Sequence, residues 1–244
     1  MRTLRTVTLL FAAALLPSAA AAKPVAKAAA QHDWTATVAA TPQGGFRMGN
    51  PAAKVKLIEY GSLTCSHCRE FDESGVPTLV GKYVKTGKVS WEFRNYVRDP
   101  WDLTASLIAR CNGAKAFFPL TRALYKDQNS WIERVQKTPR EKLEALQNLP
   151  TNKQFVESAR IAGFADWAAT RGVPAARSTQ CLSDENAVKQ LVQMTSDAAT
   201  QFPDFKGTPS FVINGALVDL GSVTAAEVWP ALETKIRAAL GERG

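Results

Sequence analysis

Two cysteines separated by two residues carry the clearest chemistry in this sequence. Cys65-Ser66-His67-Cys68 follows residues 55–60, whose alternating and β-branched side chains predict a buried strand, and it begins a pattern that predicts a helix to about Lys85. Residues three apart on a helix share one face, so the two sulfurs can form a disulfide or stand apart as a dithiol. The motif therefore predicts thiol–disulfide exchange where a strand leads into a helix.

The two cysteines are expected to differ in reactivity. Cys65, at the helix N-terminus, should be exposed and should face the free N–H groups and the positive end of the helix dipole, which both favour a thiolate. His67 can add a hydrogen-bond donor or a positive charge, which would lower the pKa of Cys65 further. Cys68, one turn further along, should be more buried and act as the resolving thiol.

Other uses of a Cys-X-X-Cys motif fit this sequence less well. A c-type haem site needs a histidine directly after the second cysteine, but residue 69 is Arg. A zinc site needs four ligands, and the chain has only two further cysteines, one further histidine and no second Cys-X-X-Cys. A purely structural disulfide in so short a loop would remove little chain entropy from the unfolded state. We predict redox chemistry, with no metal and, in the absence of P-loop and dinucleotide motifs, no cofactor.

The first residues indicate export. Two arginines lie within residues 1–5, residues 7–16 are apolar but too few to span a bilayer, and small residues follow to Ala22. This pattern predicts a signal peptide over residues 1–22, cut after Ala22, with a bacterial periplasm as the destination. Disulfides form and persist in that compartment.

The composition describes a globular chain. Its 244 residues are 45% hydrophobic and 21% charged, which is enough for one large domain or two small ones with a sizeable core. The net charge is +8, but 30 basic residues are interspersed with 22 acidic ones. Because the basic residues form no long run, we predict no nucleic-acid partner, and we expect a monomer.

The order of predicted elements suggests an α/β fold with an insertion. A second strand is predicted over residues 89–94, almost only helical patterns over 99–202, a hairpin around Asn214-Gly215, and a terminal helix from Thr224 to about Leu240. We expect a mixed sheet with flanking helices and an inserted all-helical domain. Side-chain caps are expected at Thr138, Thr151 and Ser183, and helix kinks at Pro77 and Pro230.

These elements divide the mature chain into four segments. Residues 23–50 are expected to form a flexible N-terminal extension with room for a first strand. Residues 51–100 and 203–244 together should form the sheet domain, and residues 101–202 the inserted helical domain. Four basic residues are expected to form a solvated surface. Arg94 and Arg98 precede the insertion, and Lys137 and Arg140 lie within it.

Cys111 and Cys181 are the two cysteines outside the motif. Each lies on an apolar helix face of the insertion. In an oxidising compartment, a remaining even pair is most simply a structural disulfide, and two buried free thiols are the alternative.

The motif and its distant partners resemble a known family. Glu59, the Cys65–Cys68 motif and Gly207-Thr208-Pro209-Ser210-Phe211 resemble the DsbA-type thiol:disulfide oxidoreductases of the thioredoxin-fold superfamily. The resemblance extends over nearly all of the mature chain, including the helical insertion. It implies a thioredoxin fold whose insertion interrupts the sheet domain, and an enzyme that oxidises newly exported proteins.

The resemblance also implies roles for residues outside the motif. Pro209 should follow a cis peptide bond, which is accessible energetically before proline, and the backbone of Thr208 should bind the extended chain of a substrate. Glu59 matches a buried acid that helps to move the proton of the resolving thiol; a partly exposed strand carboxylate is the alternative for it. The implied partners are reduced exported proteins and a membrane quinone reductase of the DsbB type that reoxidises the enzyme.

Two residues depart from the best-known oxidases of this family. Ser66 stands where these have proline, and Thr208 stands where some of them have an aliphatic residue; threonine there also occurs in isomerases and reductases. The leading prediction is a periplasmic dithiol oxidase. A disulfide reductase or isomerase is the alternative, followed by a redox-inert, chaperone-like binding module.

Overall fold

One six-stranded mixed sheet lies at the centre of the structure, a computed structural model that describes residues 32–242. The strand order is β1-β2-β4-β3-β5-β6; β3 and β4 are parallel, and the other neighbouring pairs are antiparallel. The strands are β1 (Val38–Ala40), β2 (Phe46–Met48), β3 (Val55–Gly61), β4 (Val89–Asn95), β5 (Ser210–Ile213) and β6 (Ala216–Leu217). The predicted signal peptide lies outside the described residues.

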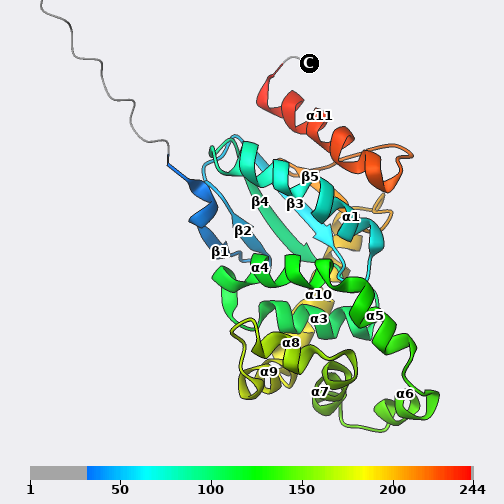
Figure 1. The fold of residues 1–244 in the computed structure, drawn as a ribbon. Coiled ribbons are helices and arrows are strands. Elements are labelled where there is room, and N and C mark those ends of the chain that lie inside the picture. Colours follow the sequence, from blue (N-terminus) through cyan, green and yellow to red (C-terminus); the bar gives the residue numbers. More distant parts are fainter. Residues whose placement is uncertain (1–31, 243–244) are drawn as a thin grey trace, which may run out of the picture. The chain divides into compact units, whose positions relative to one another are not determined.

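Helices cover both faces of this sheet (Figure 1). On one face, Phe71 of α1 packs edge-on against Phe211 of β5 and also contacts Trp229 of α11. On the other face, Tyr60 and its neighbours form a separate apolar cluster with Phe202, directly after α10. The segments around the sheet are η1 (Trp34–Ala36), α1 (Ser66–Ser74), α2 (Val76–Thr78), the π-helical η2 (Leu79–Val84), η3 (Ala225–Glu227) and α11 (Val228–Leu240).

Eight helices follow one another between β4 and β5 and form the predicted helical insertion. They are α3 (Pro100–Arg110), α4 (Gly113–Lys126), α5 (Gln128–Gln136), α6 (Arg140–Gln147), α7 (Thr151–Ala162), α8 (Phe164–Ala169), α9 (Ala175–Leu182) and α10 (Glu185–Gln201). Cys111, at the end of α3, is bonded to Cys181 of α9, with their Cα atoms 5.6 Å apart. The predicted fold class, a mixed sheet with flanking helices and inserted helices, is confirmed.

The β-hairpin after the insertion forms as the sequence predicts. Asn214 and Gly215 both have positive φ, 50° and 90°, between β5 and β6. Asn214 further fixes the hairpin against β3, because its Oδ1 accepts a hydrogen bond from Lys56 N at 2.8 Å.

The two predicted proline kinks have different outcomes. The break in the first helix lies at Gly75, before Pro77, because a proline ring clashes with the carbonyl four residues earlier. Pro230 causes no break, since it occupies the first turn of α11, where an N–H has no helical partner.

Three predicted side-chain caps are also absent. Pro139 and Pro150 precede α6 and α7 directly and preset the backbone angle, so neither Thr138 nor Thr151 provides a cap. Asp184, one residue after Ser183, caps α10 with bonds to two backbone N–H groups. The capping box of Thr224 and Glu227 is present.

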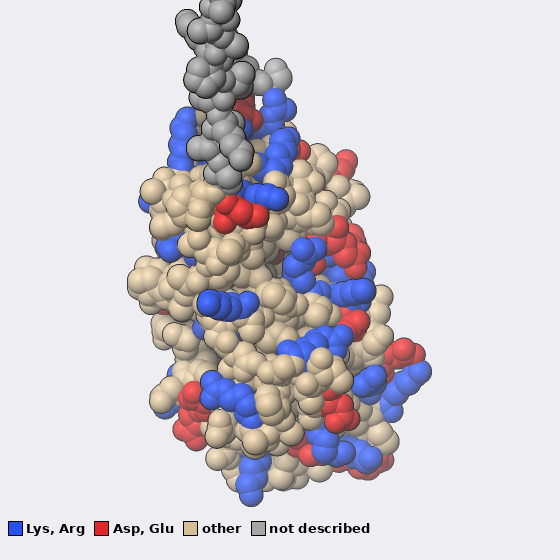
Figure 2. Space-filling view, turned by 60° about the vertical axis from the view of Figure 1, so that its left-hand side comes forward, with Lys and Arg blue, Asp and Glu red and all other residues tan. Residues whose placement is uncertain are grey.

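The charged surface is mixed. On the face that Figure 2 presents, Lys and Arg side chains alternate with Asp and Glu. Lys137 and Arg140 are exposed as predicted, each paired with a glutamate one helical turn away. The same prediction is wrong for Arg94, which is buried between Glu92 and the Tyr60 hydroxyl. Among the described residues, no helix is both long and apolar enough to cross a membrane.

Candidate active site

The turn Ser62-Leu63-Thr64 joins β3 to the Cys-X-X-Cys motif. The turn follows Gly61, the last residue of β3, where a Cβ atom would lie 2.5 Å from the ring of Phe93. Cys65 has the extended backbone of an N-cap residue, and α1 begins at Ser66. The strand thus delivers Cys65 to the N-terminus of a helix, where the sequence predicts it.

Cys65 is buried, contrary to the predicted exposure. Only 4% of the residue is accessible, because the loop before β5 covers the N-terminus of α1. The Cys65 thiol donates a hydrogen bond to the Thr208 carbonyl oxygen at 3.2 Å, and the Thr208–Pro209 peptide bond is cis. Thr208 and Pro209 therefore lie against the sulfur, as the resemblance implies.

The two thiols, which are unbonded in this structure, have opposite pKa shifts. The pKa of Cys65 is lowered to about 5, chiefly by a hydrogen bond from Cys68; burial opposes this effect, and Thr208 and the charge of Arg98 assist it. The pKa of Cys68 is raised well above its ordinary value, first by complete burial and then by its hydrogen bond to Cys65. Deprotonation therefore occurs at Cys65, with Cys68 as the donor to its thiolate.

His67 and the Thr208 hydroxyl occupy different places around this pair. His67 is exposed and lines a groove of about 410 Å³ that also includes Pro209. The Thr208 Oγ1 atom is buried and has no hydrogen-bond partner among residues 32–242. When Cys65 ionises, this hydroxyl is available to donate to the sulfur, in addition to the Cys68 thiol.

Glu59 lies beneath the pair on β3. The residue is 1% exposed, so it is not the partly exposed strand carboxylate of the alternative interpretation. Trp91 Nε1 donates to Glu59 Oε2 at 3.0 Å. Burial, and then the charge of Asp72, raise the pKa of Glu59 well above its ordinary value, and the charge of Glu59 in turn acts on Cys68. A buried acid with a raised pKa thus lies near the buried thiol whose pKa is also raised.

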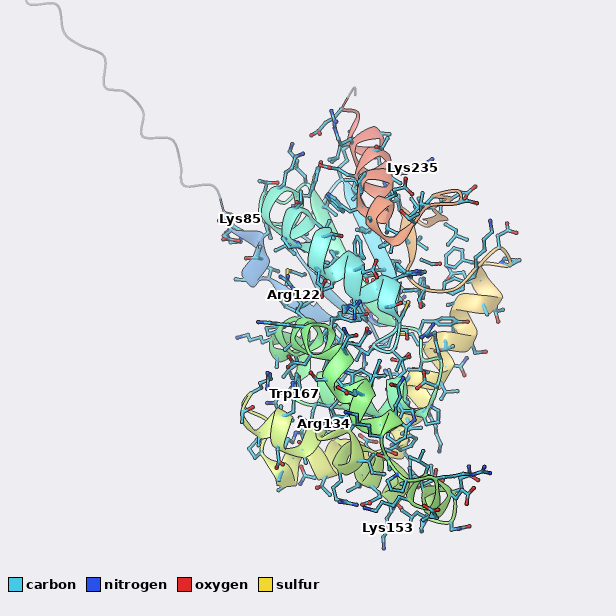
Figure 3. All side chains as sticks on the ribbon, turned by 45° about the vertical axis from the view of Figure 1, so that its right-hand side comes forward. Lys85, Arg122, Arg134, Lys153, Trp167 and Lys235 are labelled. Atoms are coloured by element: carbon cyan, nitrogen blue, oxygen red, sulfur yellow. A yellow bond between two sulfur atoms is a disulfide. The ribbon has the colours of Figure 1, made fainter. Side chains whose placement is uncertain are left out.

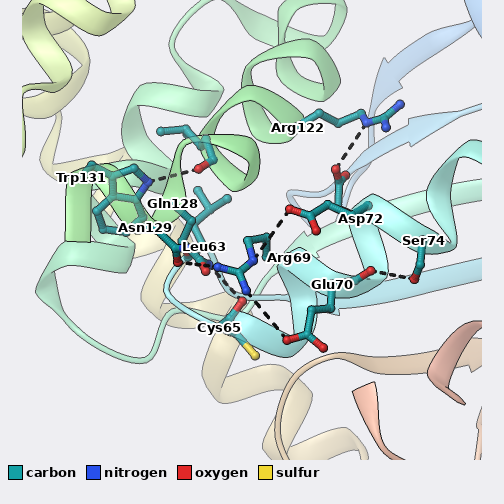
Figure 4. Close-up of polar contacts among 12 residues, drawn as sticks. Leu63, Cys65, Arg69, Glu70, Asp72, Ser74, Arg122, Gln128, Asn129 and Trp131 are labelled. Atoms are coloured by element: carbon teal, nitrogen blue, oxygen red, sulfur yellow. Dashed lines mark hydrogen bonds and ion pairs between the residues drawn. The ribbon is translucent and has the colours of Figure 1, made fainter. Parts of the chain in front are cut away.

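A second buried acid, Asp72, forms an ion pair with a residue of the insertion. Asp72 of α1 pairs with Arg122 of α4 at 3.4 Å, and burial raises the pKa of Asp72 to about 6 (Figure 4). Arg122 lies where the helices of the insertion meet those of the sheet domain, far from Lys153 at the distal end of α7 (Figure 3). No pattern in the sequence predicts this ion pair.

Three further residues bind the turn, and no sequence pattern predicts these contacts. Arg98 is exposed, as predicted, and its Nε donates to Ser62 Oγ at 3.0 Å. Asp102 of α3 and Gln128 of α5 are buried and bind the backbone of the turn. The only sequence signal for them was the start of a helix near Asp102. Among the described residues, no cluster of three or more His, Cys, Asp or Glu could hold a metal ion.

Comparisons with known proteins agree with this geometry. A family model described as thioredoxin matches residues 41–233. A Rickettsia bellii protein to which protein-disulfide oxidoreductase activity is ascribed is 30% identical over 183 residues, which cover 73% of this chain and 61% of that protein. A Rickettsia felis relative with the same description is 29% identical and is covered to 52%. The chain thus spans about half to three fifths of the length of these relatives.

Solved structures show the same architecture. A protein-disulfide isomerase from Novosphingobium aromaticivorans superposes with a TM-score of 0.73 at 35% identity, covering 80% of this chain and 97% of that one. The α-DsbA1 protein of Wolbachia pipientis superposes with a TM-score of 0.62 at 22% identity, covering 84% and 94%, which shows a shared fold. The chain belongs to the thioredoxin family, with eight helices inserted between β4 and β5 of its sheet.

Proposed function

We propose that this protein is a periplasmic dithiol oxidase that transfers the Cys65–Cys68 disulfide to exported proteins. The opposite pKa shifts of the two thiols carry the proposal, because a stabilised thiolate at Cys65 favours the dithiol form. Whatever stabilises the dithiol makes the disulfide a stronger oxidant. The predicted signal peptide over residues 1–22 supports the compartment.

The reaction consists of two exchanges between sulfurs. In the first, a substrate thiolate attacks Cys65 Sγ, a mixed disulfide forms, and the Cys65–Cys68 bond breaks with its electron pair going to Cys68. Cys68 then takes up a proton, since its raised pKa favours the thiol, and Glu59 is the buried acid placed to supply that proton. In the second, another substrate thiolate attacks the substrate sulfur of the mixed disulfide. Cys65 leaves as a thiolate, and the substrate has lost two electrons to the enzyme.

The substrate chain is assigned to the groove beside the pair. The Thr208 carbonyl lies next to Cys65 Sγ, so an extended chain that pairs with the Thr208 backbone would bring its cysteine to that sulfur. Pro209, His67, Val218 and Leu220 are among the residues that line the groove. Reoxidation is assigned to a membrane quinone reductase of the DsbB type, on the basis of the family resemblance.

The oxidase assignment is tested by refolding. Reduced, unfolded protein with several cysteines is mixed with the oxidised enzyme, and the formation of disulfides is followed by quenching with an alkylating agent. Stoichiometric oxidation of the substrate within minutes, lost in Cys65→Ser, is expected. Failure to oxidise the substrate, together with efficient reduction of insulin by the reduced enzyme, would contradict the assignment.

An isomerase is the second candidate, because the Novosphingobium structure at 35% identity is described as a protein-disulfide isomerase. Thr208 before the cis-proline is consistent with that activity. Reactivation of a scrambled, fully oxidised ribonuclease by the reduced protein distinguishes the two functions. An isomerase restores activity without an added oxidant, whereas an oxidase produces little recovery.

A further inference from the structure

Leu63, the middle residue of the turn before Cys65, is held at both of its backbone polar groups by side chains of the insertion. Asp102 Oδ1 accepts a hydrogen bond from Leu63 N at 2.8 Å, and Gln128 Nε2 donates one to Leu63 O at 2.8 Å. The two side chains are 39 and 65 residues away along the sequence. The turn therefore takes its hydrogen bonds from α3 and α5.

The same two side chains also bind Ser62, before Leu63, and Cys65, two residues after it. Asp102 Oδ2 accepts from Ser62 Oγ at 2.6 Å. Gln128 Nε2 also donates to Cys65 O at 3.0 Å (Figure 4). A side-chain amide nitrogen has two hydrogens, so Gln128 uses its full donor capacity on this segment. We call Asp102 and Gln128 the turn clamp.

Both residues of the turn clamp are buried from solvent. Asp102 and Gln128 are 0% and 1% exposed, so water cannot readily replace either of them. Tyr125 of α4 is a third residue of the insertion that binds the turn, because its hydroxyl donates to Ser62 O at 3.2 Å. Loss of Gln128 would leave the Leu63 carbonyl buried without its donor, and the turn would shift to find another.

Such a shift would act directly on the sulfur. The carbonyl of Cys65 is bound by Gln128, and the thiol on the same residue is within hydrogen-bond distance of Thr208 O. The hydrogen bonds that Cys65 makes with Cys68 and Thr208 depend steeply on distance and direction. A movement of a few tenths of an ångström at the Cys65 backbone would therefore weaken them.

We infer that Asp102 and Gln128 are positioning residues for Cys65, through which the helical insertion sets the reactivity of the redox pair. The inference rests on the proposed thiol–disulfide exchange at Cys65. It gives the helical insertion a part in the chemistry of the redox pair.

The test replaces Gln128 by an apolar side chain of similar length. Gln128→Met removes both donated hydrogen bonds, and Gln154→Met is the matched control, because Gln154 Nε2 donates to Leu149 O within the insertion, away from the motif. The pKa of Cys65 is measured in reduced protein from thiolate absorbance at 240 nm and from the rate of alkylation by iodoacetamide. Alkylation needs no protein substrate, so its result does not depend on whether the enzyme is an oxidase or an isomerase.

In Gln128→Met, the pKa of Cys65 should rise by about one unit, which lowers the thiolate fraction about tenfold at pH values below the pKa. The control should match the wild type. If Gln128→Met loses thermal stability but keeps the wild-type pKa and alkylation profile, its role is merely structural and the inference is wrong.

A second variant decides the matter if Gln128→Met does not fold. Ser62→Ala removes the hydrogen bond to Asp102 Oδ2, and with it the one that Ser62 Oγ accepts from Arg98 Nε, with a minimal change of shape. A smaller rise in the pKa of Cys65 is expected, and an unchanged pKa in this folded variant would overturn the inference. The wild-type pKa tests the proposed function separately, since a value near that of free cysteine would remove its basis while leaving the comparison between variants intact.

Discussion

At the scale of single residues, the proposed function depends on the difference between two thiols one helical turn apart. Cys65 contacts the Cys68 thiol and the backbone of Thr208, whereas Cys68 is fully buried near Glu59. We predict that Cys68→Ser accumulates mixed disulfides with reduced substrate proteins through Cys65. Non-reducing gels and peptide mapping detect them. Accumulation in Cys65→Ser instead would reverse the two roles.

Glu59 provides a prediction for both rate and stability. The raised pKa of Glu59 means that the folded protein keeps a proton that the unfolded chain releases above about pH 4.3. The free energy of unfolding therefore falls as pH rises from about 4.3 towards the pKa of Glu59 in the folded protein. Glu59→Gln keeps an acceptor for Trp91 but has no proton to give. We expect this variant to be more stable than the wild type at pH 8 and equal to it near pH 4, in urea denaturation.

The same substitution should slow the chemistry. Without the buried acid, the exchange step that releases Cys68 should slow by about 10²-fold, the lower range for general acid–base catalysis. Stopped-flow tryptophan fluorescence during reduction by a thiol measures this rate. A wild-type rate in Glu59→Gln would assign Glu59 a purely structural role.

The sequence predicts those site residues that lie close to the motif or match a family pattern. Cys65, Cys68 and their order relative to the helix follow from local spacing, and Thr208-Pro209 and Glu59 from the resemblance. Gln128 escaped prediction because its contact with the turn spans 65 residues and depends on how α5 packs. Burial of Cys65 escaped for the same reason, since it is the distant Thr208 loop that covers it.

At the scale of elements, the Cys111–Cys181 bond joins α3 to α9 across 70 residues of chain. A loop of that length stabilises the folded protein by about 4 kcal/mol in the chain-entropy model. We predict that the double variant Cys111→Ala/Cys181→Ala has a free energy of unfolding lower by about that amount, as measured by urea denaturation. Cys65→Ala/Cys68→Ala is the control, because it removes a short loop. An equal loss in both would contradict the prediction.

Strands, the hairpin and most helices could be predicted because their signals are local. Residues 55–60 and 89–94 alternate in the manner of strands, and Asn214-Gly215 fits a tight turn, so β3, β4 and the β5–β6 hairpin appear where expected. Helix ends were less predictable. Pro139 and Pro150 precede α6 and α7 directly, so neither Thr138, before Pro139, nor Thr151, the first residue of α7, is the cap. Thr138 Oγ1 bonds instead to Arg134 O. Sequence spacing alone does not rank such alternatives.

At the scale of the whole molecule, the thiolate of Cys65 links redox state to stability. Its pKa is lowered to about 5 in the folded dithiol, so the stabilisation is complete above the unfolded pKa and is lost as pH falls through 5. With an unfolded pKa near 8.5 to 9, it amounts to about 3 kcal/mol at pH 7 and about 4 kcal/mol at pH 8. Closing the four-residue Cys65–Cys68 loop stabilises the oxidised protein by about 2 kcal/mol.

The two effects oppose each other, and pH decides which is larger. We predict that the reduced protein melts above the oxidised one at pH 8 and below it at pH 5, with a crossover at roughly pH 6 to 7. Calorimetry of both forms, with Cys111–Cys181 intact in each, measures the difference. An oxidised form that is the more stable at every pH would point to a reductase.

The equilibrium of the Cys65–Cys68 pair with glutathione tests the central claim most directly. The fraction of reduced enzyme is read from tryptophan fluorescence or thiol alkylation across glutathione buffers of known potential at pH 7. An oxidase with a stabilised Cys65 thiolate should have a reduction potential more positive than about −180 mV, the value of a disulfide isomerase. A potential near that of thioredoxin, about −270 mV, would contradict the account and make the protein a reductase.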